Sequence, residues 1–407
     1  MRSTRSQLRD EADPADTHES AFIIFGSPQV PSVYSLGVAL AQLRSTSLVR
    51  IGASYLPFST APLWPVDDVA QGLSRTAWTY PPGFNGKLSR LFTRTIRDRF
   101  ERAVRGHQER DGMAPYVITP HPRFERYTSG VEEEKLVYLN YDDYATYTKA
   151  GTRIENPLEP LLVARAGTVL CSSRYQRDRF ARRFPEKTDA FWHLPHGVLE
   201  TSLNPAPGDA PVKDTVCVVG ALTARYDWAL IEEVVGRLPA VEFSFCGELE
   251  LGHVAMEREG WQAHMRTVLE RPNVSHIRSL EPGGTSHVFW SSAVSWIPYD
   301  PDLPFVKACC PLKLGNGLAS GRPVISADVP ECRLYPEWVG IHTSADEAVA
   351  RISDALHTTG SPAARERSRE QVEFASKNTW ATRAEQLIEI LERQEGASEA
   401  GAGQAPT

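Results

Sequence analysis

The stretch ACCPLKLGNGLASGRPVIS, from Ala308 to Ser326, decides how the second half of the chain folds. Its proline begins a short helical segment, the Ser-Gly pair predicts a turn, and the apolar run PVIS is typical of a buried strand. Lys313 and Asn316 fall one helical turn apart and share a face of the helix. A lysine at the start of such a helix supplies a point charge for a phosphate. The alternative, a solvated surface lysine, fits poorly with the Pro, Leu and Gly around it.

Strand-like apolar runs alternate with helical patterns along the whole chain. The predicted strands are AFIIF, SLVRIG, YVIT, KLVYL and TVLCSS in the first half, and DTVCVVG, VEFSFCG, VSHI, AVSWIPY and PVISA in the second. Because buried, β-branched strands that alternate with helices favour parallel sheets, the sequence predicts an α/β protein of two Rossmann-like, doubly wound domains. Ligands of such sheets bind beyond the carboxyl ends of the strands, which places the site in a cleft between two facing domains.

Changes in composition predict the domain boundaries. Residues 200–214 are rich in Pro, Gly and Asp and mark a linker between the domains. Polar or low-complexity sequence predicts disordered tails. The predicted order is a tail at 1–20, an N-terminal domain at 21–205, a C-terminal domain at 206–360, a long helix at 361–395 that packs back across both, and a tail at 396–407.

Composition narrows the class of protein. The chain has 407 residues, with 44 Lys and Arg against 51 Asp and Glu, and its formal net charge is −7. An acidic total disfavours nucleic acid as a partner. The six cysteines form no CxxC pair, so buried reduced thiols in a cytoplasmic protein are favoured over a redox role for the adjacent Cys309 and Cys310. We expect neither a secretory signal nor a membrane-spanning segment, because no long apolar run is present.

An ordered set of segments resembles bacterial GT-B glycosyltransferases. LVYLNYDDYATY, NPLEPLLVARAGTVLCSSRYQRDRF and FWHLPHGV resemble the acceptor half of that family, and VVGALTARYDWALIEEVVGRLPAVEFSFCG, VSWIPYDPDLPF and PLKLGNGLASGRPVIS resemble the nucleotide-sugar half. The likeness covers residues 115–345 and is to the GT4-like, polysaccharide and teichuronic type, with a looser similarity to membrane-associated glucuronosyltransferases. It implies that the N-terminal domain binds an acceptor and the C-terminal domain a nucleoside-diphosphate sugar.

The resemblance implies a donor site around the quoted stretch. Lys313 matches a residue that contacts the diphosphate, and Asn316 stands where many members have a glutamate that holds the ribose. An amide both accepts and donates hydrogen bonds, so Asn316 still suits a ribose hydroxyl. Many retaining members carry two glutamates, and Ala308 and Asn316 fill those places here. The loss weakens a retaining assignment and also admits an inactive protein.

Other candidate donor residues come from turns after predicted strands. Backbone N–H groups from Gly220 onward would face a diphosphate at a helix N-terminus, and Arg225 would add charge. The alternative there is an ordinary strand–helix turn. Tyr299 resembles a position near the nucleotide. Leu222 and Leu312 match positions that sandwich the base but would look the same in a core, and His196 is either a phosphate contact or an exposed turn residue.

The acidic turn after KLVYL predicts the catalytic base. A carboxylate shielded by Tyr138, Tyr141, Tyr144 and Tyr147 would have a raised pKa and could accept the proton of an attacking hydroxyl. The resemblance assigns Asp142 to this role. The alternative is a helix N-cap, which we assign to the adjacent Asp143. His121 also ends a predicted strand, so it is a second catalytic candidate on the acceptor side, although a structural histidine is the commoner case.

No cofactor and no metal are expected beyond the co-substrate. Asp300-Pro-Asp302 imitates a metal-binding DxD motif but reads here as a loop, so the leaving diphosphate would be stabilised by Lys313 and a helix dipole. The segment at residues 87–105 predicts a basic amphipathic helix. It suits the anionic surface of a membrane, and thus a lipid-linked acceptor and a peripheral location on its inner face. The alternative is that its apolar face packs on the sheet and its arginines are solvated.

The sequence therefore predicts a metal-independent glycosyltransferase with inversion weakly favoured. It would move a sugar from a nucleoside-diphosphate sugar to a hydroxyl of a cell-surface polysaccharide, a lipid-linked acceptor or a metabolite. One rival is a catalytically inactive, glycosyltransferase-like binding partner. A second rival, a dinucleotide oxidoreductase, is disfavoured because FGSPQVPSVYS after the first strand lacks a GxGxxG fingerprint.

Overall fold

The computed structural model describes residues 21–25, 31–53, 73–80, 89–144, 158–209, 215–250, 259–278 and 284–402. The predicted tail at 1–20, Lys87 and Leu88 of the basic segment, Tyr147, and residues 403–407 lie outside these ranges, as do parts of the linker and of FGSPQVPSVYS.

The N-terminal domain is built on a parallel sheet with the strand order β3-β2-β1-β4-β5-β6-β7. Its strands are β1 (Phe22–Phe25), β2 (Thr46–Ala53), β3 (Leu73–Tyr80), β4 (Tyr116–Thr119), β5 (Leu136–Asn140), β6 (Thr168–Cys171) and β7 (Phe191–His193). Its helices are α1 (Pro31–Leu43), α2 (Ser89–Asp111), α4 (Leu158–Arg165) and α5 (Arg174–Arg183), with 3-10 turns at Pro122–Tyr127, Glu133–Lys135, Pro185–Ala190 and Glu200–Ser202. Strands such as FIIF and TVLC are buried along their whole length, as the continuous apolar runs predict.

The C-terminal domain repeats the topology, with the strand order β10-β9-β8-β11-β12-β13. Its strands are β8 (Thr215–Val219), β9 (Glu242–Cys246), β10 (Val274–Ile277), β11 (Val294–Ile297), β12 (Val324–Ala327) and β13 (Val339–His342). Its helices are α6 (Trp228–Arg237), α7 (Trp261–Leu269), α8 (Gly284–Ser291), α9 (Pro304–Ala308), α10 (Leu312–Ala319), α11 (Ala345–Thr358) and α12 (Pro362–Ser376), with a 3-10 turn at Cys332–Leu334. All described strand pairs are parallel, so the prediction of two doubly wound α/β domains is confirmed.

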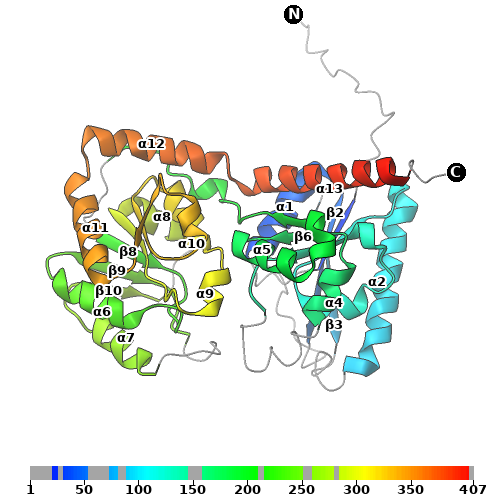
Figure 1. Ribbon diagram of the computed structural model, residues 1–407, viewed down its shortest axis with the longest axis horizontal. Helices are drawn as coiled ribbons and strands as arrows, with labels where there is room; N and C mark the ends of the chain where they lie inside the picture. The colour runs from blue at the N-terminus through cyan, green and yellow to red at the C-terminus, as the bar shows by residue number, and fades with distance from the viewer. Residues whose placement is uncertain are drawn as a thin grey trace, which may run out of the picture.

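The end of the chain forms two helices where the sequence predicted one. After α12, α13 (Trp380–Ala402) begins a new axis, and it continues through residues 396–402, where the sequence predicted a disordered tail. Figure 1 shows α12 lying along the C-terminal domain and α13 along the N-terminal domain. Leu387 and Leu391 of α13 are buried in the same core as Leu36 and Leu40 of α1. The helix breaks at Lys377–Thr379 because this segment pairs with the other connection between the domains.

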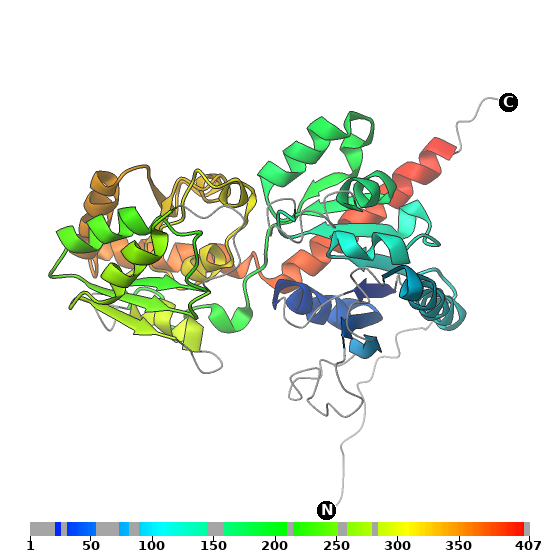
Figure 2. The ribbon, with the colours of Figure 1, turned by 90° about the horizontal axis from the view of Figure 1, so that it is seen from below.

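That pairing joins the two chain crossings between the domains. Val198 N–H donates to the Asn378 carbonyl at 2.9 Å, and Trp380 N–H donates to the Val198 carbonyl at 3.1 Å. Gly197 lies so close that a Cβ atom there would stand 2.7 Å from the Trp380 backbone. The two crossings are therefore held as a single short joint, and Figure 2 shows the domains side by side with this joint between them.

Helix α2 lies on the outer edge of the N-terminal domain, remote from the other domain (Figure 1). Its apolar residues Ile96 and Phe100 are buried in the core, while Arg94 and Arg97 form ion pairs with Asp98 and Glu101. The apolar face therefore packs against the sheet, which favours the structural alternative for this helix. A membrane contact through its arginines stays a prediction. Among the described residues, no helix combines the length and apolarity needed to cross a membrane.

Candidate functional site

Helix α10 carries Lys313 to the carboxyl ends of β8 and β11. The helix begins after Pro311, and no side chain caps its first turn. The Lys313 ammonium donates a hydrogen bond to the Tyr226 hydroxyl and lies 4.6 Å from the ring centre of Tyr226 and 4.5 Å from that of Tyr299. Cation–π contacts of this kind hold an ammonium group at a fixed place. An uncapped helix start with a lysine in its first turn is suited to binding an anion.

The environment of Lys313 changes its protonation. Burial and, to a smaller extent, the neighbouring positive charge of Arg225 together lower the pKa of Lys313 to about 7. The amine is therefore divided between its two forms near neutral pH. A diphosphate placed beside it would favour the charged form, so binding of an anion and uptake of a proton would be coupled.

One glycine, Gly220, shapes the turn beside the lysine. Gly220 follows β8 with φ at +116°, and a Cβ atom there would lie 3.1 Å from the Lys313 nitrogen. Its N–H donates to the Cys246 carbonyl at 2.8 Å, and the N–H of Leu222 donates to Glu248. These two amides are engaged within the fold, and the start of α6 is capped by Asp227, whose carboxylate accepts from Leu230 N–H at 3.1 Å. These amides are not open to a diphosphate, so Gly220 serves to clear space for Lys313, and the start of α10 is an open helix start at this end of the sheet.

Arg225 lies between the two halves of the candidate site. Its backbone carbonyl accepts from Asp300 N–H at 2.8 Å, and its guanidinium lies 4.1 Å from the ring centre of Phe305. The same charge lowers the pKa of Lys313 in its own domain and that of Asp142 in the other. The arginine therefore links the candidate base and the candidate phosphate contact across the domain junction.

Asp142 is held in a turn directly after β5. Its backbone carbonyl accepts from Asn140 Nδ2 at 3.1 Å and from Gln176 Nε2 at 3.4 Å, and its carboxylate accepts from Asp143 N–H at 3.0 Å. Burial raises the pKa of Asp142 to about 7, although Arg225 opposes the increase. A carboxyl group with a pKa near neutrality is suited to accepting a proton from a hydroxyl.

The neighbours of Asp142 have structural partners. Asp143 is 1% exposed and pairs with Arg179 on α5 at 3.1 Å. The helix that it was expected to cap would fall in residues 145–157, outside the described ranges. His121 begins the turn Pro122–Tyr127, where its Nδ1 atom accepts from Arg123 N–H at 3.1 Å. Its ring lies 4.3 Å from that of Tyr144, so it borders the acidic turn while acting as a cap.

The remaining predicted donor residues divide between surface and core. Leu312 is 42% exposed beside Lys313, whereas Leu222 is fully buried in the core of the C-terminal domain, which favours the core alternative for Leu222. Asn316 is partly exposed on α10, one turn after Lys313. Burial and Arg383 lower the pKa of His196 to about 4, so its ring is neutral at physiological pH and brings no positive charge to a phosphate. It borders a cavity of about 30 Å³ at the crossover, together with Leu312 and Arg383.

Sequence reasoning missed two residues at this junction. Tyr226, next to Arg225, forms an isolated antiparallel bridge with Tyr299 and holds the lysine. Its position in the ARYD turn was the available signal. Glu331 follows β12, is 1% exposed, and contacts the N-terminal domain through His193 at 2.7 Å. No local pattern marks Glu331, because its partners come from a distant part of the chain.

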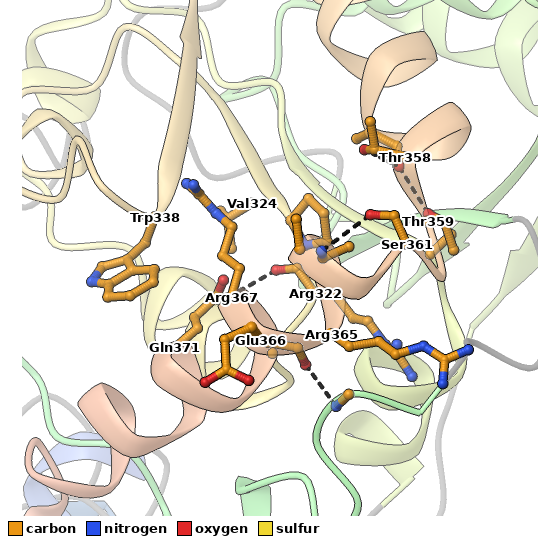
Figure 3. Close-up of a pocket in the computed structure, with 18 of the residues that line it drawn as sticks. Arg322, Val324, Trp338, Thr358, Thr359, Ser361, Arg365, Glu366, Arg367 and Gln371 are labelled. Carbon is orange, nitrogen blue, oxygen red and sulfur yellow. Dashed lines mark hydrogen bonds between the residues drawn. The ribbon is translucent and has the colours of Figure 1, made fainter.

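A larger hollow of about 810 Å³ lies elsewhere on the C-terminal domain, among α11, α12 and the ends of β12 and β13. Figure 3 shows several arginines around it. Arg322 donates to the carbonyls of Trp290 and Asp209, Arg365 to that of Gly360, and Arg367 to that of Glu337. The acidic side chains of Asp209, Asp354, Glu366 and Glu370 share the lining with these arginines, so the hollow carries charges of both signs. Within the described ranges, no cluster of His, Cys, Asp and Glu is suited to a metal ion.

The fold is that of the GT-B class. A sucrose-phosphate synthase from Thermosynechococcus elongatus superposes with a TM-score of 0.63 at 14% identity, covering 93% of this chain and 100% of its own. A glycosyltransferase from Rickettsia africae ESF-5 gives 0.64 at 9% identity, with 92% and 98% covered. The structure titled "Trehalose-6-phosphate from E. coli bound with UDP-2-fluoro glucose" gives 0.57 at 12% identity, with 91% and 99% covered.

A curated relative is similar in sequence over a shorter range. The "Putative teichuronic acid biosynthesis glycosyltransferase TuaH" of Bacillus subtilis (strain 168) is 22% identical over 202 residues, which is 47% of this chain and 48% of the relative. The chain thus matches about half the length of that relative. No family model matches the sequence. The expected resemblance to GT-B glycosyltransferases is confirmed at the level of fold and of this partial likeness.

Proposed function

We propose that this protein is a glycosyltransferase that moves a sugar from a nucleoside-diphosphate sugar to an acceptor hydroxyl. The observation that carries the proposal is the contact between the domains at α9, where Ser173 Oγ donates to the Ala308 carbonyl at 2.6 Å and the Arg225 guanidinium lies 4.1 Å from the ring centre of Phe305. The charge of Arg225 acts there on both Lys313 and Asp142. One domain thus supplies an anion-binding lysine and the other a carboxylate with a pKa near neutrality, at the ends of two parallel sheets where ligands bind. The comparisons support the class of reaction, and the substrates are part of the proposal.

Each residue has a role in the proposed reaction. The acceptor oxygen attacks the anomeric carbon while the bond from that carbon to the diphosphate oxygen breaks. Asp142 takes the hydroxyl proton, and the departing diphosphate keeps the bonding electron pair. Lys313, Arg225 and the open start of α10 stabilise the negative charge that develops on the leaving group. Attack on the face opposite the diphosphate inverts the anomeric centre. Asn316 would bind a ribose hydroxyl, and no metal is required for these steps.

A binding experiment tests the donor site directly. Wild type and Lys313→Ala are heated with a panel of nucleoside diphosphates and their sugars, and the melting temperature is recorded. The proposal expects at least one compound to raise the melting temperature of the wild type and to have little effect on the variant. If none of them stabilises the wild type, the proposed donor site is wrong.

The rival of an inactive binding partner makes a different prediction for Asp142. An enzyme in which Asp142 is the base loses turnover in Asp142→Asn while it keeps donor binding. A binding partner has no turnover to lose in either protein. Measuring donor binding and sugar transfer on the same two samples separates these outcomes.

A further inference from the structure

The N-terminal and C-terminal domains share a polar contact at the start of α5. Ser173 Oγ donates to the Ala308 carbonyl at 2.6 Å, and Arg174 N–H donates to Glu331 Oε2 at 2.9 Å. The other oxygen of Glu331 is hydrogen-bonded to His193 Nε2 at 2.7 Å. Both oxygens of one buried carboxylate of the C-terminal domain are therefore bound by groups of the N-terminal domain.

The position of Glu331 makes it a helix cap supplied from the other domain. Helix α5 begins at Arg174, and its own cap residue Ser173 accepts from Gln176 N–H at 3.2 Å. Glu331 accepts a hydrogen bond from Arg174 N–H, which the side chain of Ser173 does not cap. A carboxylate at this end of a helix is favoured by the helix dipole as well as by the hydrogen bond. Separating the domains would leave this carboxylate without its partners and α5 without part of its cap.

The same helix holds the turn that contains the candidate base. Gln176 Nε2 donates to the Asp142 carbonyl at 3.4 Å, and Arg179 pairs with Asp143 at 3.1 Å. Both contacts come from the first two turns of α5, so a shift of its first turn moves the donors that hold Asp142. A continuous set of hydrogen bonds thus leads from Glu331 through α5 to the acidic turn.

We propose that Glu331 is a positioning residue that couples closure of the two domains to the placement of Asp142. When the domains meet, Glu331 completes the cap of α5, and α5 then fixes the acidic turn beside Arg225. When they part, the cap is lost and the turn loosens. The role of Asp142 as the catalytic base rests on the proposed function. The coupling between Glu331 and the acidic turn is a property of the ligand-free chain.

Hydrogen–deuterium exchange of the full, ligand-free chain tests the coupling without a substrate. In Glu331→Ala we expect peptides that cover residues 174–176 and residues 140–144 to exchange about threefold faster or more than in wild type. Glu331→Gln should keep most of the protection, because an amide can still accept from Arg174 N–H and donate to the His193 ring. The matched control is Glu337→Ala, which removes an exposed carboxylate from the same region and should leave both peptides unchanged.

The pattern of exchange decides the outcome. Faster exchange at 174–176 with no change at 140–144 would show that Glu331 caps α5 without reaching Asp142, and would overturn the proposal. No change at either place would overturn it as well. If Glu331→Ala does not fold, His193→Ala removes one of the two partners and is expected to raise exchange in both peptides by a smaller factor. A parallel titration with UDP keeps the two proposals apart, since failure to bind UDP counts against the donor site and leaves the coupling intact.

Discussion

Lys313 shows how a single residue can report on the occupancy of its site. Two tyrosine rings and one hydroxyl hold its ammonium group, yet burial and Arg225 bring its pKa to about 7. The free protein therefore carries a positive charge at Lys313 only part of the time at neutral pH. An anionic ligand would restore the charge, so proton uptake by Lys313 on ligand binding can be measured.

We predict that binding of UDP weakens as pH rises from about 7.5 to 9, a range in which the ligand's own phosphates are fully ionised. With a pKa of about 7, free Lys313 is mostly neutral over this range and must take up a proton on binding, so the dissociation constant should rise by up to about tenfold per pH unit. Calorimetry in buffers of different ionisation enthalpy would show the uptake of a proton.

Lys313→Met should remove this pH dependence and weaken binding by about 10- to 100-fold, as expected for loss of a charge-assisted hydrogen bond. Lys307→Met removes an exposed lysine from the neighbouring helix α9 and is the matched control, with wild-type binding expected. An unchanged pH dependence in Lys313→Met would assign the proton to another group.

The raised pKa of Asp142 leads to a prediction about how the stability of the protein depends on pH. Its pKa is raised by burial to about 7, so between about pH 4 and 7 the folded protein binds the proton more tightly than the unfolded chain. Its contribution to stability is present at low pH and is lost as pH rises through 7. Asp142→Asn should equal wild type near pH 4 and exceed it by about 1–2 kcal/mol at pH 8, after allowance for solvent at a half-buried group.

Urea denaturation at several pH values measures the difference. Asp354→Asn removes an exposed carboxylate and should follow the wild-type curve at all of them. A curve for Asp142→Asn that stays parallel to wild type would show that this carboxyl titrates at its ordinary pKa.

At the scale of elements, α10 is placed by a glycine. A Cβ atom at Gly317 would lie 2.9 Å from Val324 Cγ2 on β12 and 3.1 Å from Ser295 Oγ on β11. The helix thus packs against the sheet at a distance that alanine does not permit, and this sets where Lys313 stands. We predict that Gly317→Ala destabilises the protein by about 1–3 kcal/mol, as overpacking does, and weakens UDP binding.

At Gly106 of α2, replacement of glycine by alanine should have the opposite effect on stability. A Cβ atom there would meet nothing within 4 Å. Gly106→Ala should therefore stabilise the protein by about 0.5–1 kcal/mol through helix propensity alone. Denaturation midpoints of both variants test the pair, and a destabilised Gly106→Ala together with a neutral Gly317→Ala would contradict the packing argument.

Some helices and strands can be predicted from the sequence, and others cannot. Runs such as FIIF and TVCVV are buried throughout, so composition alone predicts β1 and β8. Strand β3, with the sequence LSRTAWTY, was not predicted, because it lies at the edge of its sheet and has no continuous apolar run. Strand β7 has three residues and carries too little pattern. The break between α12 and α13 is caused by pairing with Val198. Because it contains neither Pro nor Gly, the local sequence does not mark it.

The candidate site divides in the same way. Lys313, Arg225 and Asp142 follow strands or begin a helix, so local order and the family likeness place them. The roles of Tyr226 and Glu331 depend on contacts between segments far apart in the chain, 87 residues for the Tyr226–Lys313 bond and 138 for the Glu331–His193 bond. No local pattern encodes such distances. Local sequence therefore indicates candidate site residues better than it indicates the residues that hold them in place.

At the scale of the whole molecule, the joint between the domains depends on Gly197. Its close approach to Trp380 leaves no room for a side chain. We predict that Gly197→Ala separates the two crossings, lowers the free energy of unfolding by about 2–4 kcal/mol, and changes how the domains are arranged. Small-angle X-ray scattering of the ligand-free protein should show a larger radius of gyration.

Gly396→Ala is the control for this variant, because a Cβ atom on that part of α13 would meet nothing within 4 Å. It should scatter as the wild type does. A Gly197→Ala protein with wild-type scattering and stability would show that the two crossings can move apart without consequence.

The seating of α13 on the N-terminal domain also has a consequence for synthesis. Ala384, Leu387, Ile388 and Leu391 complete a core that begins with Phe22 and Ile24. A ribosome that makes this chain releases those first strands long before the helix that covers them. The sheet of the C-terminal domain, contiguous in sequence, is finished earlier than the domain that precedes it. The N-terminal domain, although it is made first, therefore completes its core only when α13 has been synthesised. Until then it exposes apolar surface that a chaperone would recognise.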